Sequence, residues 1–496
     1  MTRKSSATHW AGFLKGPKLP VGQGRTWAAL RARHLASQAS RIRCLISIAL
    51  GLALAGCSSS RPSGFTDVQS QVQARTGYNV QCNPMCAEQQ ATDGVVDGLL
   101  QHELTAEQAA QIALLKNPSL QVTFQSLGIS EAAVLQAGML KNPGISLDLR
   151  FPNGPPSATY AQVALMDDFL DVLLVGLRKK MANEQLEQTK LTVSHEVLDL
   201  IAEVKTAFYS LQGQEQLVTR LQLIEEFNLA AAELAKRQFD AGTTNELDLK
   251  SQQLLASQSR GDVIQAQGRA LDGRERLHRL MGLSARPINW RISPRLPTIP
   301  EEEIAGNYVE SLALAQRLDL AARRRRVAVA QYALELREKT RYFPGGINLG
   351  VSSERETDRQ VRTGPSLDLQ LPIFDQGQGE IARLQAELCQ EQWQVDSLAS
   401  DVRAQVRRAY GNLMTSRDLA KLYGSVVLPQ RVELVELNLR HYNAMLKGAY
   451  DLLLAKQNEV TTERDYVEAW RDYWIARTEL ERAVGGPLPL QRRNQP

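Results

Sequence analysis

Two stretches of the chain, about 200 residues apart, carry nearly the same pattern. The segment "ALLKNPSLQ" from Ala113 corresponds to "ALAQRLDLA" from Ala313, and "FDAGTTNELDL" from Phe239 corresponds to "YNAMLKGAYDL" from Tyr442. The offset rises only from 200 to 203 along the chain, so almost nothing is inserted into either copy. A repeat this long predicts a duplicated unit, because solenoid repeats have far shorter periods.

Each copy has the pattern of a long helix, two short strands and a second long helix. Between about Arg178 and Phe239 there is neither Pro nor a turn cluster, and apolar residues recur in steps of three and four. A helix of about 62 residues is roughly 93 Å long. The stretch from about Gly379 to Tyr442 is expected to match it. The fold class is therefore mainly α with a small β part, in one elongated architecture.

The two expected β-hairpins cover residues of about 145–166 and 347–371. Apolar and polar residues alternate in each strand, so each strand has one apolar face. Four strands cannot close a barrel, and open sheet edges are not tolerated in hydrocarbon, so a membrane role demands several chains. Three chains would supply twelve strands with room for water inside. Alternating strands also occur in soluble sheets, and that alternative stays open.

The amino terminus resembles a secretory signal. Nine Lys or Arg and no acid precede Gly56, and the apolar run from Cys44 to Ala55 is too short to span a bilayer as a helix. Residues 1–56 are therefore expected to be a signal peptide. Its removal leaves 49 basic and 54 acidic residues, so the basic balance of the whole chain does not indicate nucleic-acid binding.

Few residues have the types and spacing of a reactive site. Cys82, Met85 and Cys86, with His102 further on, are weak candidates for soft metal ligands, and the two Cys could equally form a local disulfide or do neither. No cofactor is predicted. Because no Gly-rich phosphate loop, nucleophile elbow or complete metal motif is present, we do not expect an enzyme.

Three further motifs have structural interpretations. "HEVLD" from His195 has Asp199 where a zinc-protease helix has its second His, so a place in the helical stripe is favoured. The run Arg323–Arg326 is expected to be a solvated helical face. Trp470 and Trp474, one helical turn apart, are expected to pack between helices.

With these elements the chain resembles the TolC-type outer membrane factors, in their lipoprotein (OprM/CusC-like) branch. The resemblance covers essentially all of the mature chain and rests on "LAGC" at Leu54 to Cys57, "RTGYNV" from Arg75 and "LQLPIFDQGQ" from Leu369, among other segments. It implies a homotrimer in which a twelve-stranded outer-membrane β-barrel continues into an α-barrel across the periplasm. It also implies passive conduction of substrates delivered by an inner-membrane pump and a periplasmic adaptor. "LAGC" is similar to a lipobox, which implies that Cys57 is acylated, and Ser58 after it points to the outer membrane.

The resemblance also implies a gate at the periplasmic tips of the helical hairpins. It implies that Asp451 is an acid of the aperture ring, Lys447 a basic latch, Tyr442 a hydrogen-bonding latch residue and Asp248 the acidic partner on the other hairpin. The tip turns are expected at Gly242 and Gly448, while Met445 stands where the family has Gly. The alternative is that Asp248 and Asp451 only start helices, where carboxylates are favoured.

The expected organisation follows the duplication. It comprises residues 57–103 as a lipid-anchored amino-terminal segment, 104–290 as the first repeat with a tip at about 240–246, 291–302 as a linker, 303–486 as the second repeat with a tip at about 443–449, and 487–496 as a tail. The alternative function is that of a lipid-anchored structural coiled coil in the periplasm without a pore. Cargo, cognate pump and the resting state of the gate do not follow from the sequence.

Overall fold

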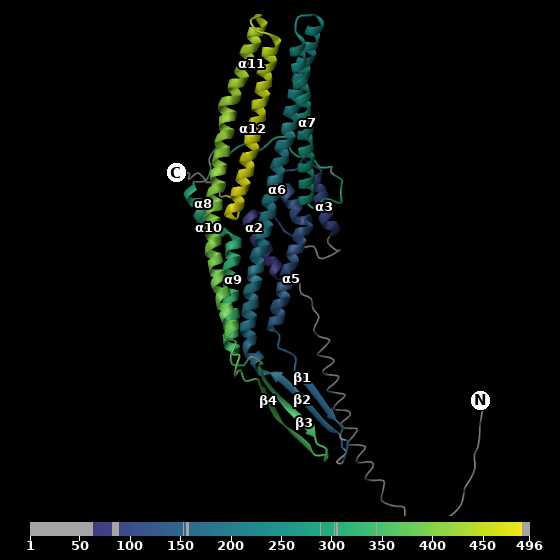
Figure 1. The fold of residues 1–496 in the computed structure, drawn as a ribbon, viewed down its shortest axis with the longest axis vertical. Coiled ribbons are helices and arrows are strands. Elements are labelled where there is room, and N and C mark those ends of the chain that lie inside the picture. Colours follow the sequence, from purple (N-terminus) through teal and green to yellow (C-terminus); the bar gives the residue numbers. More distant parts are fainter. Residues whose placement is uncertain are drawn as a thin grey trace, which may run out of the picture. The chain divides into compact units, whose positions relative to one another are not determined.

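The computed structural model describes residues 63–81, 89–151, 153–154, 158–287, 289–301, 303, 306–343 and 345–488. Met1–Arg61 and Pro62–Pro496 form separate units, and all the described helices and strands belong to the second. Its elements are α2 (Ser63–Thr76), α3 (Gln89–Leu100), α4 (Ala106–Lys116), α5 (Pro118–Gly138), β1 (Gly144–Arg150), β2 (Tyr160–Asp168), α6 (Phe169–Asp240), α7 (Glu246–Leu280), α8 (Gly306–Gln316), α9 (Leu318–Thr340), β3 (Ile347–Arg355), β4 (Val361–Leu369), α10 (Gln378–Leu422), η1 (Tyr423–Val427), α11 (Leu428–Asn443) and α12 (Ala449–Val484) (Figure 1).

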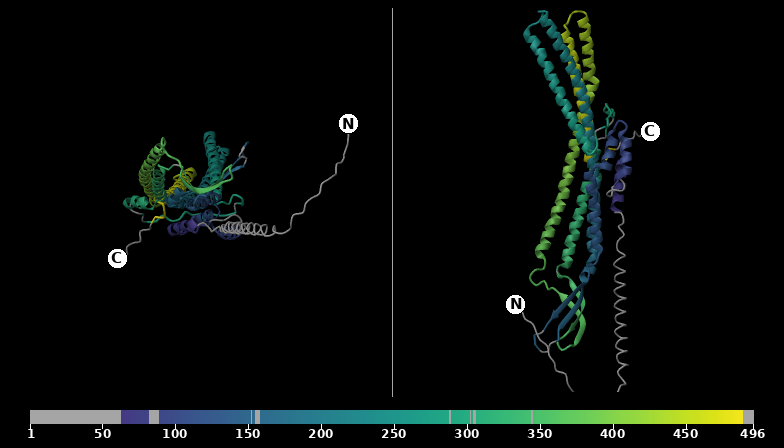
Figure 2. Two further views of the ribbon diagram at one scale, coloured as in Figure 1. Left: turned by 90° about the horizontal axis from the view of Figure 1, so that it is seen from below. Right: turned by 90° about the vertical axis from the view of Figure 1, so that its right-hand side faces the viewer.

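This unit is mostly helical with one four-stranded antiparallel sheet, which confirms the expected class. The sheet lies at one end, and the hairpins α6–α7 and α11–α12 end in two tips at the other (Figures 1 and 2). α6 runs for 72 residues without a break and begins at Phe169, nine residues before the predicted start. The apolar residues that start at Phe169 continue the pattern of β2 in the sequence, but in the structure they already belong to α6.

The helices form a layer that is one helix thick at the tips. There α6 packs against α7 and α12, and α12 packs against α11, so the order is α7–α6–α12–α11. Nearer the sheet the order is α5–α6–α9–α10, and in the sheet it is β1-β2-β3-β4. At all three levels, one outer edge comes from the first repeat and the other from the second.

The repeats are joined where α12 meets the linker. The indole Nε1 atoms of Trp470 and Trp474 both donate to the carbonyl of Pro297 at 2.8 Å, and the Trp474 ring stacks on Tyr209 of α6 with centroids 5.3 Å apart. Arg477, also on α12, pairs with Glu303, which is almost fully buried, at 2.7 Å. The two tryptophans therefore bind the chain between the repeats as well as packing between helices.

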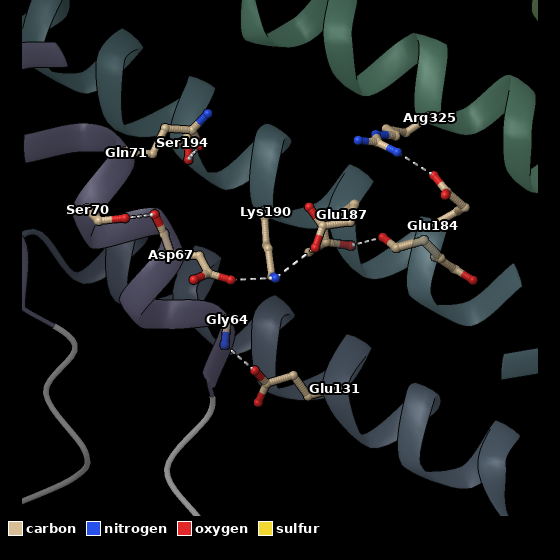
Figure 3. A network of polar contacts seen from close by, with 12 residues as sticks. Gly64, Asp67, Ser70, Gln71, Glu131, Glu184, Glu187, Lys190, Ser194 and Arg325 are labelled. Carbon is tan, nitrogen blue, oxygen red and sulfur yellow. Dashed lines mark hydrogen bonds and ion pairs between the residues drawn. The ribbon is translucent and has the colours of Figure 1, made fainter. Parts of the chain in front are cut away.

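α2, which belongs to the amino-terminal segment, is held by polar contacts to the first repeat (Figure 3). Lys190 of α6 lies between Asp67 of α2 at 2.7 Å and Glu187 at 2.8 Å. At the other end of α2, Arg75 donates to the carbonyls of Gln316 and Gly485, which belong to the second repeat. α2 thus ties both repeats together.

The arginine run on α9 is largely exposed, as the sequence indicated, and it also forms ion pairs to the neighbouring helices. Arg323 and Arg326 both pair with Glu391 of α10, at 3.3 and 2.7 Å, and Arg325 pairs with Glu184 of α6 at 3.0 Å. These ion pairs connect α9 to α6 on one side and to α10 on the other.

The second repeat contains a π-helical turn that the first lacks. The N–H of Leu428 donates to the carbonyl of Tyr423, five residues earlier, and Pro429 follows. Below this turn the copies align with an offset of 202, since Leu211 and Leu413 are both buried; at the tips Phe239 aligns with Tyr442, an offset of 203. η1 therefore accommodates one extra residue, which is how π-bulges usually arise in α-helices.

Deleting Ser425 together with Pro429→Ala should convert η1 into a continuous α-helix like the matching part of α6. The residues on both sides keep their faces, so helical circular dichroism and protease resistance should stay at wild-type level, and the melting temperature should stay within about 3 °C. Deleting Glu225 of α6 is the matched control. α6 has no bulge that could absorb this deletion, so one half of the helix rotates by about 100° against the other, and the deletion should abolish folding. Loss of the fold in the first variant would contradict the assignment of η1 as an insertion.

Candidate functional site

The first tip is closed by a glycine in the left-handed conformation. Gly242 has φ +72°, and the N–H of Thr243 donates to the carbonyl of Gln238 at 2.8 Å, which satisfies the last turn of α6. α7 then starts with Asn245 as its N-cap, whose side-chain oxygen accepts from the N–H of Asp248 at 2.8 Å. The turn geometry follows directly from these residue types.

In the second tip the left-handed position falls on Met445, with φ +57°, where the first copy has Gly242. Gly448 has φ −82° and is the N-cap of α12, and its N–H donates to the carboxylate of Asp451 at 3.0 Å. A left-handed conformation is unfavourable for a side chain such as that of Met. The second tip is therefore the more strained of the two.

The two predicted gate carboxylates both lie in the first turn of a helix. Asp451 caps α12, and Asp248 accepts a hydrogen bond from the hydroxyl of Thr244 at 3.1 Å. Their negative charge is favourable at helix amino termini. This capping role leaves both side chains exposed at the tip, so it is compatible with a role in an acidic ring.

The structure does not bring Lys447 to Asp248 within one chain. The ammonium of Lys447 donates to Asn438 of its own hairpin at 2.9 Å, and the Tyr442 side chain is 42% exposed. A latch between Lys447 and Asp248 would therefore have to form between chains, and it stays a prediction.

The structure shows a link between the tips that the sequence analysis missed. The hydroxyl of Tyr450 on α12 donates to the side-chain oxygen of Gln238 on α6 at 2.7 Å. Burial, and to a lesser extent the charge of nearby Asp248, raises the pKa of Tyr450 above its usual value. Tyr450 corresponds to Leu247 in the first copy, and this change from an apolar to a hydroxyl-bearing side chain was the signal in the sequence.

The sheet has one apolar and one polar face, as the alternation predicts. One row across the four strands is Ile145, Leu165, Val351 and Pro365. On the opposite face the row is Asp148, Gln162, Glu354 and Arg362. Large side chains of the apolar face are exposed, with Ile145 at 76% and Leu147 at 64%. An exposed apolar face of this extent requires a partner or lipid.

The strands β1 and β4 each have one edge without a partner strand in the described chain. In the order β1-β2-β3-β4 the outer strands run in opposite directions, so β4 of one copy can pair in antiparallel fashion with β1 of another.

Two negative findings apply to the described ranges. Among these residues, no helix combines the length and apolar character needed to cross a bilayer. Within the same ranges, no three His, Cys, Asp or Glu side chains are grouped to hold a metal ion. Cys57, Cys82, Met85 and Cys86 lie outside the described residues, so neither the lipid attachment nor the weak metal candidates are tested.

The described chain thus consists of long helical hairpins with a small antiparallel sheet at one end, and both outer strands of that sheet have one open edge. Residues 109–283 match the family described as outer membrane efflux protein. Similar structures include the CmeC outer membrane channel of Campylobacter jejuni, 13% identical over 82% of this chain and 90% of that one with a TM-score of 0.65. The open MtrE outer membrane channel of Neisseria gonorrhoeae is 16% identical over 77% and 89%, with a TM-score of 0.61.

Among curated proteins, the cobalt-zinc-cadmium resistance protein CzcC of Cupriavidus metallidurans is 22% identical over 393 residues, which are 77% of this chain and 90% of CzcC. The resemblance to the TolC-type outer membrane factors is thereby confirmed.

Replacing Tyr450 by Phe should separate the two tips within a chain. The variant loses one partly buried hydrogen bond, worth about 0.5–1.5 kcal/mol, and keeps the ring. Spin labels at Ala241 and Ala444 should report a broader and longer distance distribution by pulsed electron resonance. Tyr332→Phe on α9, far from the tips, is the control; identical distributions in all three proteins would contradict the link.

Proposed function

We propose that this protein is the outer-membrane channel of a tripartite efflux system, which passively conducts substrates from a periplasmic adaptor and an inner-membrane pump to the outside. The observation that carries the proposal is the sheet, with its apolar face and its two complementary open edges, at the end of a long helical layer. The family match and the efflux and resistance roles named for the similar proteins support it.

The open edges support a homotrimer. Four strands per copy give eight strands in a dimer, a barrel whose interior side chains largely fill, and twelve in a trimer, which leaves room for water. The polar row with Asp148, Gln162 and Glu354 suits a wet interior. In the trimer the helical layers close in the same way into an α-barrel that crosses the periplasm.

The two ends of this architecture support the proposed location. Strands of seven to nine residues are about 23 to 30 Å long. At the tilt of about 35–45° that a closed barrel requires, the nine-residue strands rise by about 21 to 25 Å, close to the roughly 25 Å apolar band of an outer-membrane barrel. Acylation of Cys57 adds an anchor in the outer membrane. The tips then lie in the periplasm, where the adaptor docks. Drugs, other toxic compounds and metal ions are the substrate classes, and cobalt, zinc and cadmium ions are supported by the name of CzcC.

The tips act as a gate held by weak interactions. The Tyr450–Gln238 hydrogen bond joins the hairpins within a chain, and Lys447, Tyr442 and Asp248 hold neighbouring chains. An exposed ion pair contributes about 0.2–1 kcal/mol, small enough for adaptor docking to reverse. A lipid-anchored scaffold without a pore is the second candidate, but it has no use for an amphipathic strand pair in each repeat.

The function is tested by purifying the lipidated chain from outer-membrane fractions, measuring its mass and inserting it into planar bilayers. A trimer that migrates differently after heating and gives discrete conductance steps is expected. A monomer that leaves the membrane once its lipid is removed, without conductance, would favour the scaffold.

Lys447→Gln and Asp248→Asn should each raise the open probability of the reconstituted channel, by about two- to fivefold for a loss of 0.5–1 kcal/mol. Single-channel recording in bilayers measures this directly. Lys236→Gln, on α6 in the hairpin of Asp248 but outside the tip turn, is the control. Conductance traces unchanged from wild type in both gate variants would count against the latch.

Cys57→Ser should abolish incorporation of radiolabelled palmitate while leaving the strands intact. If Cys57 is the lipidated residue, the label disappears from the chain in Cys57→Ser and persists in Cys389→Ser. Label retained in Cys57→Ser would show that another residue carries the lipid.

A further inference from the structure

α7 has two apolar rows on opposite faces. The first consists of Leu249, Ala256, Val263 and Leu277, which follow a seven-residue spacing and are buried on the side of α6. A seven-residue spacing is the mark of helices that pack side by side as coiled coils. This row accounts for the packing of α7 within its own chain.

The second row is open. It consists of Leu247, Leu254, Gly261 and Gly268, again seven residues apart, with Ile264 and Leu271 beside it. Leu247 is 74% exposed, and Ile264 and Leu271 are each 61% exposed. A Cβ atom placed on Gly261 or Gly268 would meet nothing within 4 Å. We call the surface around these two glycines the α7 notch. Two apolar rows on opposite faces suit a helix with two helical neighbours, and α6 is the one helix of the described chain that packs extensively against α7.

The other edge of the same layer is also open. α11 has no buried residue, and apolar side chains of the α10–η1–α11 edge are between 41% and 49% exposed: Leu419, Leu422, Val426, Leu434 and Leu437. Within the described residues no element covers this edge beyond α12.

The notch and the π-turn lie at the same height. The two tips end together (Figures 1 and 2), and heights along the helices can be counted from them at about 1.5 Å per residue. Gly261 and Gly268 are 15 and 22 residues from the first residue of α7, and Leu428 and Lys421 are 15 and 22 residues from the last residue of α11. The notch therefore spans the same heights as η1.

We propose that copies of this chain join by seating η1 of one copy in the α7 notch of the next. The inference rests on the proposed homotrimer and names the surfaces that form it. A π-turn is wider than an α-turn, and two glycines without side chains give the wider backbone room to approach. The occupant is a second copy because the open edges, α7 and β1 on one side and α11 and β4 on the other, are complementary at both levels. Heterologous contacts of this kind form a ring when the rotation from one copy to the next closes.

The first test is disulfide cross-linking of the full-length trimer in a Cys389→Ser background. Gly268→Cys combined with Leu422→Cys places the two thiols at matching heights and should give covalent dimers and trimers on denaturing gels after mild oxidation. Gly268→Cys combined with Leu437→Cys, about 22 Å higher, should give none. Each single-Cys variant controls for the native thiols of the chain.

The second test asks whether the notch must be empty. Gly268→Leu fills it and should lower the trimer fraction at least tenfold at equal protein concentration, measured by light scattering after gel filtration. Gly98→Leu on α3, which also points into open space, should leave the fraction unchanged. The variant with Ser425 deleted and Pro429→Ala removes the wide turn but keeps the helices, and it should also lose the Gly268–Leu422 cross-link.

The outcomes separate this inference from the proposed function. If the wild-type protein is a trimer but the Gly268→Cys/Leu437→Cys pair cross-links instead of the Gly268→Cys/Leu422→Cys pair, the notch is overturned and the channel function stands. The same holds if Gly268→Leu remains trimeric. A wild-type protein that stays monomeric in detergent and in membranes would overturn both.

Discussion

The edges of the four-stranded sheet impose the constraint on which the rest of the structure depends. A strand edge presents N–H and C=O groups that must find partners, and in hydrocarbon each group left unpaired costs several kcal/mol. β1 and β4 present such edges in each copy, and the helical layer above them presents the apolar rows of α7 and α11. The single chain is thus incomplete on the same two sides at every level. In the proposed trimer one operation, joining the next copy, satisfies the sheet and the helices together.

Much of this architecture could be predicted because it depends on periodicity. The alternation around Leu147 and Leu349 assigned the strand faces correctly, since a period of two leaves only one set of residues for each face. The start of α6 was placed too late because the apolar segment from Phe169 has only one charged interruption, Asp171, and so lacks the regular polar positions that distinguish a helical stripe from a strand. The next charged residue is Arg178, nine residues after Phe169, which is where the prediction placed the start.

Contacts between distant parts of the chain could not be predicted from their local pattern. The run Arg323–Arg326 has the composition of a solvated face, and only the positions of Glu184 and Glu391 on neighbouring helices turn it into a set of interhelical ion pairs. Likewise the gate carboxylates were placed by resemblance, but the bond between Tyr450 and Gln238 depends on how two hairpins lean together. A sequence specifies which face of a helix is apolar more readily than it specifies the neighbour.

The one-residue insertion explains why a duplicated chain need not have equivalent halves. An extra residue in a continuous helix must either rotate every residue beyond it by about 100° or be confined to one wide turn. Rotation would remove α11 from α12 and the tip from Gln238, so the insertion is confined to η1, between the buried Ala420 and the exposed α11. A π-turn has weaker hydrogen-bond geometry than the α-turns of α6. In the proposed trimer, opening of the tips is therefore expected to meet its smallest resistance in the second hairpin of each copy, so the ring of six similar hairpins would be mechanically threefold.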